Sequence, residues 1–388
     1  MEQQESAVAL CALGAEKVVS NELRKLGLKV TDSRFGRVRF RADLAGLYRA
    51  LTALRAADRV LLEAASFPAG DFEALFEGAR AVPWERLVSR GMGFAVTKVR
   101  ANRSKLRAET SVQAVVHKAA AERLCGAFRI RRLPKGGETA ELRVYIEKDQ
   151  VSLLLDLSGE PLFKRGYRTE GGAAPLRETT AAAVLLLSNW RRKFPLYDPF
   201  CGSGTILIEA AMYAWDMAPG LGRRFALEGL PIAKRETGEA VRAELAAGIN
   251  FDRRIRIFGS DTDSRALSAA RSNLARALAS GGRRDGPAGP ELSLLPMEEA
   301  RAPAGCGDTA PPGFVVTNPP YGKRIGSPQE AEATYGRMAD LGKRFPGWKL
   351  ALITSHPGFE SFFGRKADSC RELSNGAAPS FLFQYEGL

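Results

Sequence analysis

The sequence predicts an α/β protein, with a doubly wound, mostly parallel sheet in its C-terminal half and an α+β region before it. From residue 181 onward, short apolar runs alternate with helical patterns, and this alternation favours parallel strands joined by right-handed crossovers. A turn containing two glycines, Asp198 to Gly204, lies between a predicted strand and a predicted helix. Such a turn is a common ligand-binding feature at the edge of a parallel sheet.

Residues 1–60 form the first predicted unit, a small α+β structure. The periodicity gives a strand within 6–15, a helix over 16–26, a strand over 37–41 and a helix ending at residue 54. Gly27 follows the first helix and Asp43 precedes the second. A glycine terminator and an acidic N-cap are favoured at those positions.

Residues 61–158 form the second predicted unit. Its helices are expected at 72–79, 84–87 and 111–125, and a strand at 94–99. Strands at 141–146 and 151–156 are expected to pair as a hairpin across Lys148 and Asp149. The first of these strands alternates apolar and polar residues, as in a sheet that is wet on one side.

Residues 159–388 form the third predicted unit, the one with the parallel sheet. Its strands are expected at 195–198, 255–258, 291–295, 314–317 and 350–354, and its helices at 181–190, 205–215, 264–279 and 334–345. Stretches 281–290 and 301–313, which are rich in Gly, Pro and Arg, are expected to be surface loops.

Charge is concentrated in the second unit. The chain has 57 Lys and Arg against 44 Asp and Glu, a net charge of +13. Between Arg86 and Lys135 the basic residues exceed the acidic ones by far, and such a cluster attracts phosphate backbones. A solvated basic face is the alternative. We assign RNA contacts to seven of these side chains: Arg100, Arg103, Lys105, Arg107, Arg129, Arg131 and Arg132.

Several classes of protein are disfavoured. The five cysteines are scattered without a Cys-x-x-Cys pair, which argues against a disulfide framework and a structural zinc site. The polar N-terminus is unlike a secretory signal, and no apolar run is long enough to span a bilayer. We assign no metal or catalytic role to His117 or His356, and we expect a cytoplasmic monomer.

The turn after the 195–198 strand predicts a nucleotide-like cofactor. Phe200, Gly202 and Gly204 form the turn, and Asp198 could accept hydrogen bonds from an amino-acid ammonium group. Asp261, after the next strand, could bind ribose hydroxyls, whereas Asp263 suits a helix cap. The spacing from Gly204 to Asp261 far exceeds the ~20 residues of a compact dinucleotide fold, which requires an insertion around 218–248. Glu298 could accept from an adenine amine, or it could be an ordinary surface acid.

A second motif, Asn318-Pro319-Pro320-Tyr321, follows the 314–317 strand. Two prolines make a rigid turn whose carbonyls stay available. An exocyclic amine is a weak nucleophile, so acceptors at Asn318 and the Pro319 carbonyl could orient its lone pair. Tyr321 could stack on an unstacked base. An ordinary turn is the alternative for this motif alone. Together the two motifs predict methyl transfer from S-adenosylmethionine to an exocyclic amine.

At these residues the chain resembles a family, the bacterial THUMP-domain RNA methyltransferases that modify guanine N2 in 23S ribosomal RNA. The resembling segments are 163–168, 174–178, 198–204, 208–211, 218–220, 259–261 and 318–324. The resemblance implies a ferredoxin-like unit at 1–60, a THUMP-like RNA-binding unit at 61–158 and a Rossmann-like catalytic domain at 159–388. It also implies that Pro175 and Leu176 line the methionine side of the cofactor pocket.

Other functions remain open at this point. The Asn-Pro-Pro-Tyr turn is similar to those of DNA adenine-N6 methyltransferases and of release-factor glutamine methyltransferases. The basic N-terminal region favours nucleic acid over protein, and within RNA a tRNA guanine-N2 methyltransferase is the alternative. An RNA-binding assembly factor with an inactive methyltransferase fold is the alternative that is not an enzyme.

Overall fold

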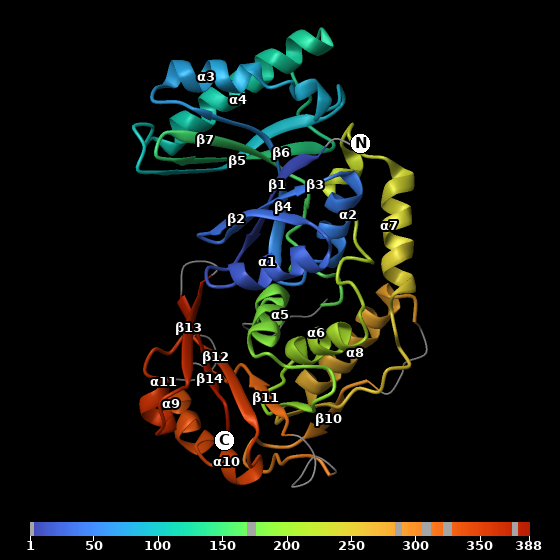
Figure 1. Ribbon diagram of the computed structural model, residues 1–388, viewed down its shortest axis with the longest axis vertical. Coiled ribbons are helices and arrows are strands. Elements are labelled where there is room, and N and C mark those ends of the chain that lie inside the picture. Colours follow the sequence, from blue (N-terminus) through green and yellow to red (C-terminus); the bar gives the residue numbers. More distant parts are fainter. Residues whose placement is uncertain (1–3, 169–175, 284–288, 305–311, 321–327, 375–378) are drawn as a thin grey trace.

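The chain folds into two seven-stranded sheets that are stacked along the long axis of the molecule (Figure 1). The computed structural model describes residues 4–168, 176–283, 289–304, 312–320, 328–374 and 379–388. Pro175 and Tyr321, two of the predicted site residues, lie outside the described residues. Among the described residues, no helix combines the length and apolar character needed to cross a membrane.

The N-terminal sheet joins the first two predicted units into one structure, in the order β2-β3-β1-β4-β7-β6-β5. Its elements are β1 (Glu5–Cys11), α1 (Glu16–Lys25), β2 (Lys29–Arg34), β3 (Arg37–Ala42), α2 (Leu44–Ala53), β4 (Ala57–Pro68), α3 (Phe72–Ala81), η1 (Trp84–Arg86), β5 (Gly93–Asn102), α4 (Glu109–Phe128), β6 (Thr139–Glu147) and β7 (Gln150–Asp156). β4 pairs with β1 between Ala57 and Leu62 and with β7 from Leu61 to Pro68. The predicted boundary between residues 60 and 61 therefore falls inside a shared strand.

Local signals at several element ends are confirmed. The Asp43 side chain accepts from the backbone N–H of Gly46 and caps α2, and Asp71 caps α3 in the same way. Lys148 and Asp149 both have left-handed backbone, with φ of 52° and 60°. Two consecutive positive φ values match the tight turn that a two-residue hairpin requires. β6 alternates buried and half-buried residues as predicted.

The C-terminal sheet has the order β10-β9-β8-β11-β12-β14-β13. The elements are α5 (Glu178–Leu187), β8 (Leu196–Asp198), α6 (Thr205–Ala214), η2 (Ala226–Gly229), α7 (Arg235–Ala247), β9 (Ile257–Asp261), α8 (Ser264–Ser280), β10 (Glu291–Leu294), β11 (Phe314–Thr317), α9 (Pro328–Met338), α10 (Leu341–Arg344), β12 (Lys349–Thr354), α11 (Phe359–Phe363), β13 (Ser369–Ser374) and β14 (Pro379–Tyr385). Strands β10, β9, β8, β11 and β12 pair in parallel, and β14 is antiparallel to both of its neighbours, β12 and β13.

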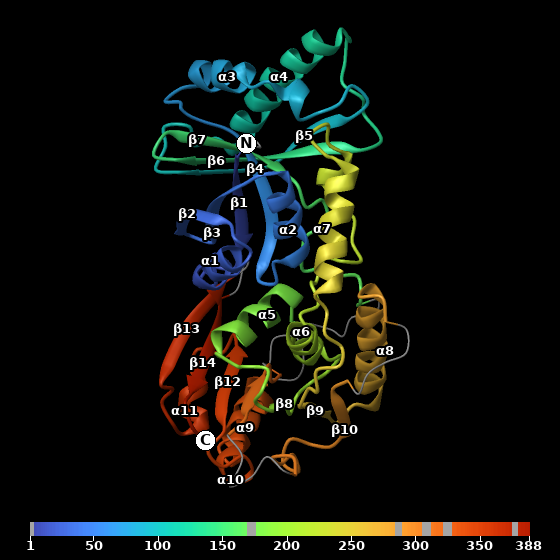
Figure 2. The same cartoon turned by 45° about the vertical axis from the view of Figure 1, so that its right-hand side comes forward.

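This sheet confirms the predicted doubly wound, mostly parallel fold. Figures 1 and 2 show α5, α6 and α8 on the side that faces the N-terminal half, and α9 to α11 on the opposite side. Chain order runs outward in both directions from the pair β8 and β11. Such a reversal opens a crevice at the carboxyl ends of the two strands, where ligands bind in open α/β sheets.

Some predicted elements were wrong or missed. The helix predicted at 334–345 is two helices, because α9 ends in bonds from Ala339 to Gly336 and from Asp340 to Arg337. These tighter bonds between residues three apart commonly end an α-helix. The sequence patterns did not reveal β2, β4, α7, α11 and the hairpin of β13 and β14.

The two halves of the molecule are closely packed at the predicted insertion. The Gly220 N–H donates to the Thr52 carbonyl at 2.8 Å, and a Cβ at Gly220 would lie 2.8 Å from the Thr52 Cα. On α7, a Cβ at Gly238 would lie 3.0 Å from the Tyr48 ring of α2. Glycine at both positions lets the insertion approach α2, which explains the need for glycine at residues 220 and 238.

Candidate active site

The two predicted motifs meet at the tips of neighbouring strands. β8 pairs with β11 through Leu196 and Phe314, and Asp198 and Thr317 are the last residues of these strands. The Thr317 hydroxyl donates to the Asp198 carboxylate at 2.7 Å. Both side chains are buried, with Asp198 only 1% exposed and Thr317 fully covered. The turn before α6 and the Asn318 turn therefore start from one buried hydrogen bond.

Asp198 is an acid in an apolar setting. Burial and, to a smaller extent, the negative charge of Asp261 raise its pKa, which is about 7. Hydrogen bonds from Thr317 and from the Phe200 backbone N–H, at 3.1 Å, oppose the rise. A buried carboxyl of this kind gains from a positively charged partner, because the partner favours its ionised form.

The glycine turn has the conformation that the motif predicts. Gly202 and Gly204 have φ of 52° and 83°, the left-handed region that glycine adopts without strain. A Cβ at Gly204 would lie 3.0 Å from the Ala270 Cβ on α8, whereas a Cβ at Gly202 would meet nothing within 4 Å. Gly204 thus allows the turn to pack against α8, and the backbone at Gly202 borders open space in front of the N-terminus of α6.

Asp261 fixes the turn from the neighbouring strand. One of its oxygens accepts from the Gly202 N–H at 2.8 Å, and the other accepts from the Asp263 N–H at 2.9 Å. A carboxylate has lone pairs beyond these two bonds, so it can still accept from hydroxyl groups. Asp263 accepts from the Arg265 N–H and caps α8, which confirms the predicted helix cap.

Glu298 follows β10, at the edge of the same sheet. Its side chain is 44% exposed and forms a 2.7 Å ion pair with Arg337 of α9. Its carboxylate is thus already engaged with a cation, an arrangement that suits the surface-acid alternative as well as a ligand contact.

The Asn318 turn is supported from the other side of β11. Asn318 is half-buried and Pro319 is buried. The Tyr335 hydroxyl, on α9, contacts the Pro320 carbonyl oxygen at 3.5 Å and the Thr354 hydroxyl at 2.9 Å. Tyr335 and Thr354 are fully covered. No sequence pattern indicated Tyr335, because it lies 15 residues from Pro320, in helix α9.

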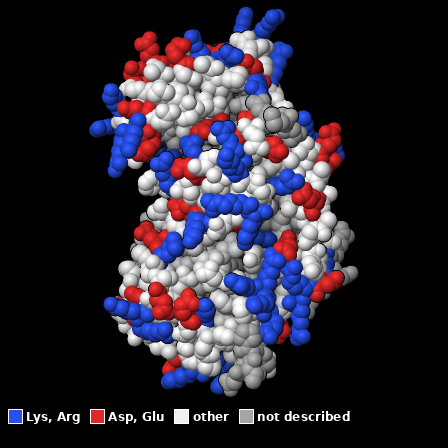
Figure 3. Space-filling view, in the orientation of Figure 1, with Lys and Arg blue, Asp and Glu red and all other residues white. Residues whose placement is uncertain are grey.

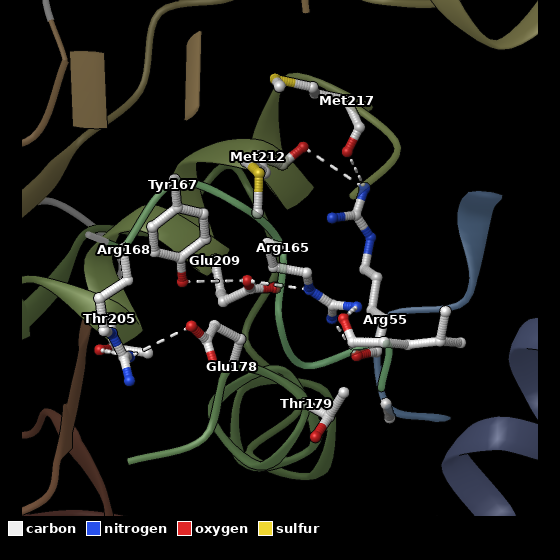
Figure 4. A network of polar contacts seen from close by, with 12 residues as sticks. Arg55, Arg165, Tyr167, Arg168, Glu178, Thr179, Thr205, Glu209, Met212 and Met217 are labelled. Atoms are coloured by element: carbon white, nitrogen blue, oxygen red, sulfur yellow. Dashed lines mark hydrogen bonds and ion pairs between the residues drawn. The ribbon is translucent and has the colours of Figure 1, made fainter. Parts of the chain in front are cut away.

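Arg168 connects the segment before α5 with the start of α6. Its guanidinium donates to the Thr205 hydroxyl at 2.6 Å and to the Leu176 carbonyl at 3.0 Å. It also lies 3.5 Å from the Glu178 carboxylate (Figure 4). Leu176, predicted to line the cofactor pocket, is thereby held beside the helix that follows the glycine turn.

Behind this contact lies a buried ionic network (Figure 4). Glu209 of α6 is fully covered; its Oε1 lies 3.5 Å from the Arg165 guanidinium and 3.3 Å from the Tyr167 hydroxyl. Arg165 also donates to the Arg55 carbonyl, and Arg55 donates to the Met217 carbonyl at 2.7 Å. The network therefore joins the end of α2 in the N-terminal half to the core of the catalytic half.

The residues predicted to bind RNA do not form a single patch. All seven are exposed, but Arg100, Arg103, Lys105 and Arg107 precede α4, and Arg129, Arg131 and Arg132 follow it. α4 has 20 residues, and an α-helix rises about 1.5 Å per residue, so the two groups lie about 30 Å apart. The basic run that is continuous in sequence is thus divided into two groups, one at each end of α4.

Among the described residues, no three metal-ligating side chains gather into a group.

Comparison with known proteins places this geometry in a family. Residues 165–284 and 300–382 match the family described as "RMKL-like, methyltransferase domain", and residues 6–61 match the "RlmL ferredoxin-like domain". YpsC of Bacillus subtilis (strain 168), which is named as an RNA methyltransferase, is 34% identical over 97% of this chain and 95% of its own. The ribosomal RNA large subunit methyltransferase K/L of Syntrophotalea carbinolica is 34% identical over 96% of this chain. This chain spans 52% of that longer enzyme.

Solved structures agree over the whole chain. SMU.472, named as a methyltransferase and crystallised with S-adenosylhomocysteine, is 35% identical, with a TM-score of 0.86 over 100% of this chain and 99% of its own. A Listeria monocytogenes protein named as an N6-adenine-specific DNA methylase is 35% identical, with a TM-score of 0.88 over 100% of this chain and 97% of its own.

Proposed function

The chain belongs to the RMKL-like methyltransferase family, and on that premise we propose that it methylates the exocyclic N2 amine of a guanosine in large-subunit ribosomal RNA. The observation that carries the proposal is the hydrogen bond between Asp198 and Thr317, because it joins the tip that would hold the cofactor to the tip that would hold the target. The names of YpsC and of the K/L enzyme support RNA as the substrate. The resemblance to guanine-N2 enzymes supports the target atom.

The cofactor is S-adenosylmethionine, the methyl donor of this fold, and the residues present fit it. When bound, it supplies a methyl group on a positively charged sulfur. Asp198 would pair with its ammonium group, and Asp261 would accept from the ribose hydroxyls. The open backbone at Gly202 leaves room for the ligand next to the α6 N-terminus. Leu176 would contact the methionine side.

Catalysis would then depend on positioning. The Asn318 side-chain oxygen and the Pro319 carbonyl would accept the two amine hydrogens, so that the nitrogen lone pair points away from the ring plane toward the methyl group. Tyr335 holds the turn through the Pro320 carbonyl. Tyr321 would stack on the extruded base, which repays part of the unstacking free energy.

Mass spectrometry of nucleosides tests the proposal. A deletion strain and its parent are compared for N2-methylguanosine in purified 23S ribosomal RNA and in transfer RNA. We expect the signal from 23S ribosomal RNA to fall in the deletion strain and to return with the plasmid-borne gene. A loss confined to transfer RNA would move the substrate to the alternative. Unchanged nucleosides in both pools would refute a guanine-N2 activity.

Adenine-N6 methylation of DNA is the second candidate, and the name of the Listeria protein favours it. Purified protein with radiolabelled S-adenosylmethionine should label RNA and leave DNA of matched sequence unlabelled. Labelled N6-methyldeoxyadenosine in the DNA would establish the second candidate instead. Calorimetry with S-adenosylmethionine tests the alternative of an assembly factor with an inactive methyltransferase fold. Such a protein should show no saturable binding of the cofactor.

Thr317→Val is expected to move the pH dependence of cofactor binding to higher pH. In the free protein the pKa of Asp198 is about 7, so affinity for the ammonium group should fall as pH falls through that value. The Thr317 hydrogen bond lowers this pKa, so its loss raises the pKa and moves the pH profile upward. Calorimetry with S-adenosylhomocysteine between pH 5.5 and 8.5 measures the shift.

Thr52→Val is the matched control for that experiment. Thr52 is fully covered, and within the described structure its hydroxyl has no hydrogen-bond partner. Its variant should keep the wild-type pH profile. If Thr317→Val also kept it, Asp198 would not be the group that controls ammonium binding.

Neutralising either end of α4 is expected to weaken RNA binding. Each phosphate contact that is lost lowers the slope of log K against log salt by about 0.7–0.9. Two triple variants test the two ends separately: one changes Arg129, Arg131 and Arg132 to Gln, and the other changes Arg103, Lys105 and Arg107 to Gln. We expect each variant to lower the salt slope independently of the other. Sites about 30 Å apart act additively. Filter binding at several salt concentrations measures both, and an unchanged slope would place the phosphate contacts elsewhere.

A further inference from the structure

The N-terminal sheet has a second face with its own small core. Alternate residues such as Ala7, Ala9 and Val60 belong to the main core that the helices cover. The residues between them, Val8, Leu61 and Leu154, form a separate apolar cluster and are at most 1% exposed. Leu10 of β1 and Tyr145 of β6, both partly buried, pack against this cluster.

This second face is concave. Arg39 of β3 donates to the Ser152 hydroxyl of β7 at 3.0 Å, although β1 and β4 lie between those strands. Neighbouring strands are about 4.8 Å apart, so β3 and β7 would be about 14 Å apart in a flat sheet. The Arg37 guanidinium lies 4.9 Å from the centre of the Tyr145 ring, one strand further on. The sheet therefore curls around this face.

Basic side chains outnumber acidic ones on the concave face, judged by strand alternation and by the contacts above. By the strand register, the basic residues are Lys29, Arg34, Arg37, Arg39, Arg41, Arg59, Lys98, Arg100 and Arg143, and the acidic ones are Asp32, Glu63, Glu141, Glu147 and Asp156. We call six of the basic residues the arginine face: Arg37, Arg39, Arg41, Arg59, Lys98 and Arg143. Figure 3 shows Lys and Arg side chains on this side of the molecule from about the height of β1 down to that of α5 in Figure 1.

The two central carboxylates, Asp156 and Glu63, form ion pairs with arginines of this face. The Asp156 side chain is 1% exposed and pairs with Arg59 and with Arg143 at 3.4 Å. The Glu63 side chain is 11% exposed and pairs with Arg39, whose side chain is 28% exposed. The acids therefore lie at the floor, and the guanidinium groups stand nearer to solvent in fixed orientations. Burial lowers the pKa of Lys98, and the charges of Arg100 and Arg143 lower it further, as expected where the field is positive.

We propose that the arginine face is a docking surface for the phosphate backbone of folded RNA. The inference rests on the proposed RNA methyltransferase function. It adds a second surface, distant from the catalytic strand tips, that would bind another part of the same RNA. Planar guanidinium groups that are already oriented match phosphate oxygens in pairs. The concave shape suits a convex polyanion more than an extended acidic peptide. Arg59 also donates to the Gly159 carbonyl at 2.7 Å, so the surface continues into the chain that leads to the catalytic half.

The test uses a variant that avoids the buried ion pairs: Arg37→Gln, Arg41→Gln and Lys98→Gln together. Its matched control is Lys17→Gln, Arg24→Gln and Lys25→Gln, which removes the same charge from exposed positions of α1 in the same unit. Binding to a transcript of 23S ribosomal RNA is measured over a range of salt concentrations. We expect the arginine-face variant to bind about tenfold to a hundredfold more weakly near 0.1 M salt and to lose about 2 to 3 from the salt slope. The control should change less than about threefold, and S-adenosylhomocysteine affinity should be unchanged in both.

Three results would overturn the inference: an equal loss in the control, an unchanged salt slope in the variant, or displacement of the RNA by poly-glutamate at matched charge. The wild-type protein separates this failure from that of the proposed function. If wild-type protein methylates RNA while the arginine-face variant binds like wild type, the docking surface alone is wrong. If wild-type protein neither binds nor methylates RNA, the proposed function is wrong, and the docking surface is wrong with it.

Discussion

Replacing Asn318 with alanine is expected to lower kcat for methyl transfer by at least a factor of about 10²–10³, the typical cost of removing one preorganised polar contact to the reacting group. The amide oxygen would orient an amine whose lone pair is conjugated into the base, and alanine offers no acceptor. The side chain is half-buried and follows directly on the buried tip of β11, so no neighbour on the strand can replace it. Single-turnover methylation of RNA with labelled cofactor measures the loss.

Two other measurements show whether the effect is on the chemical step. Affinities for S-adenosylhomocysteine and for RNA should both stay within a few-fold of wild type in Asn318→Ala, because the contact acts on one amine only. Asn318→Asp keeps an acceptor oxygen and should retain more activity than Asn318→Ala. Wild-type turnover in Asn318→Ala would refute the positioning mechanism, and loss of cofactor binding would mean that the turn supports the cofactor pocket instead.

The position of Asp198 and Thr317 at strand tips was predictable because general rules about parallel sheets govern it. Short apolar runs ending in Asp198 and Thr317 predict strand tips at one sheet edge, and the reversal of strand order brings those two tips together. The glycine turn and the Asp263 cap are local features with local signals. What could not be predicted was the contact between the tips, since 119 residues separate Asp198 from Thr317.

The missed elements have physical explanations in their own patterns. β4 carries a register shift between Glu63 and Ala65, which breaks the period-two alternation that identifies a strand. In α7, Gly238 and Val241 are the buried residues, so the helix has little apolar periodicity. α7 packs against α2 of the N-terminal half, a long-range contact that no local pattern records.

The RNA-binding prediction shows the same limit on a larger scale. The basic residues are close together in the sequence, but closeness in sequence does not give their distance in space. α4 separates its two parts, and curling of the sheet brings Arg37 and Arg39 of β3 toward β6 and β7. Arg168 and Tyr335 were missed for a similar reason. Arg168 donates to Thr205 of α6, and the Tyr335 hydroxyl contacts the Pro320 carbonyl, so each contact joins segments that are distant in the sequence. The pattern of residues 163–168 by itself indicates only a family resemblance.

Replacing Arg165 with methionine is expected to lower the free energy of unfolding by about 3–5 kcal/mol, the usual cost of leaving one member of a buried ion pair alone. Glu209 is fully covered, and its two contacts through Oε1 are long, at 3.5 and 3.3 Å. Its Oε2 has no hydrogen-bond partner among the described residues. Without Arg165 its charge would be poorly compensated.

The double variant Arg165→Met with Glu209→Leu distinguishes this charge effect from a packing effect. Removing both charges removes the uncompensated carboxylate, and apolar replacements of buried ion pairs are often neutral or stabilising. Arg165 also donates to the Leu162 and Arg55 carbonyls, and these acceptors stay unpaired in both variants, so recovery should be partial. Urea unfolding followed by circular dichroism measures the series. If the double variant were as unstable as Arg165→Met, the network would act through the backbone acceptors of Arg165, and its ionic character would not matter.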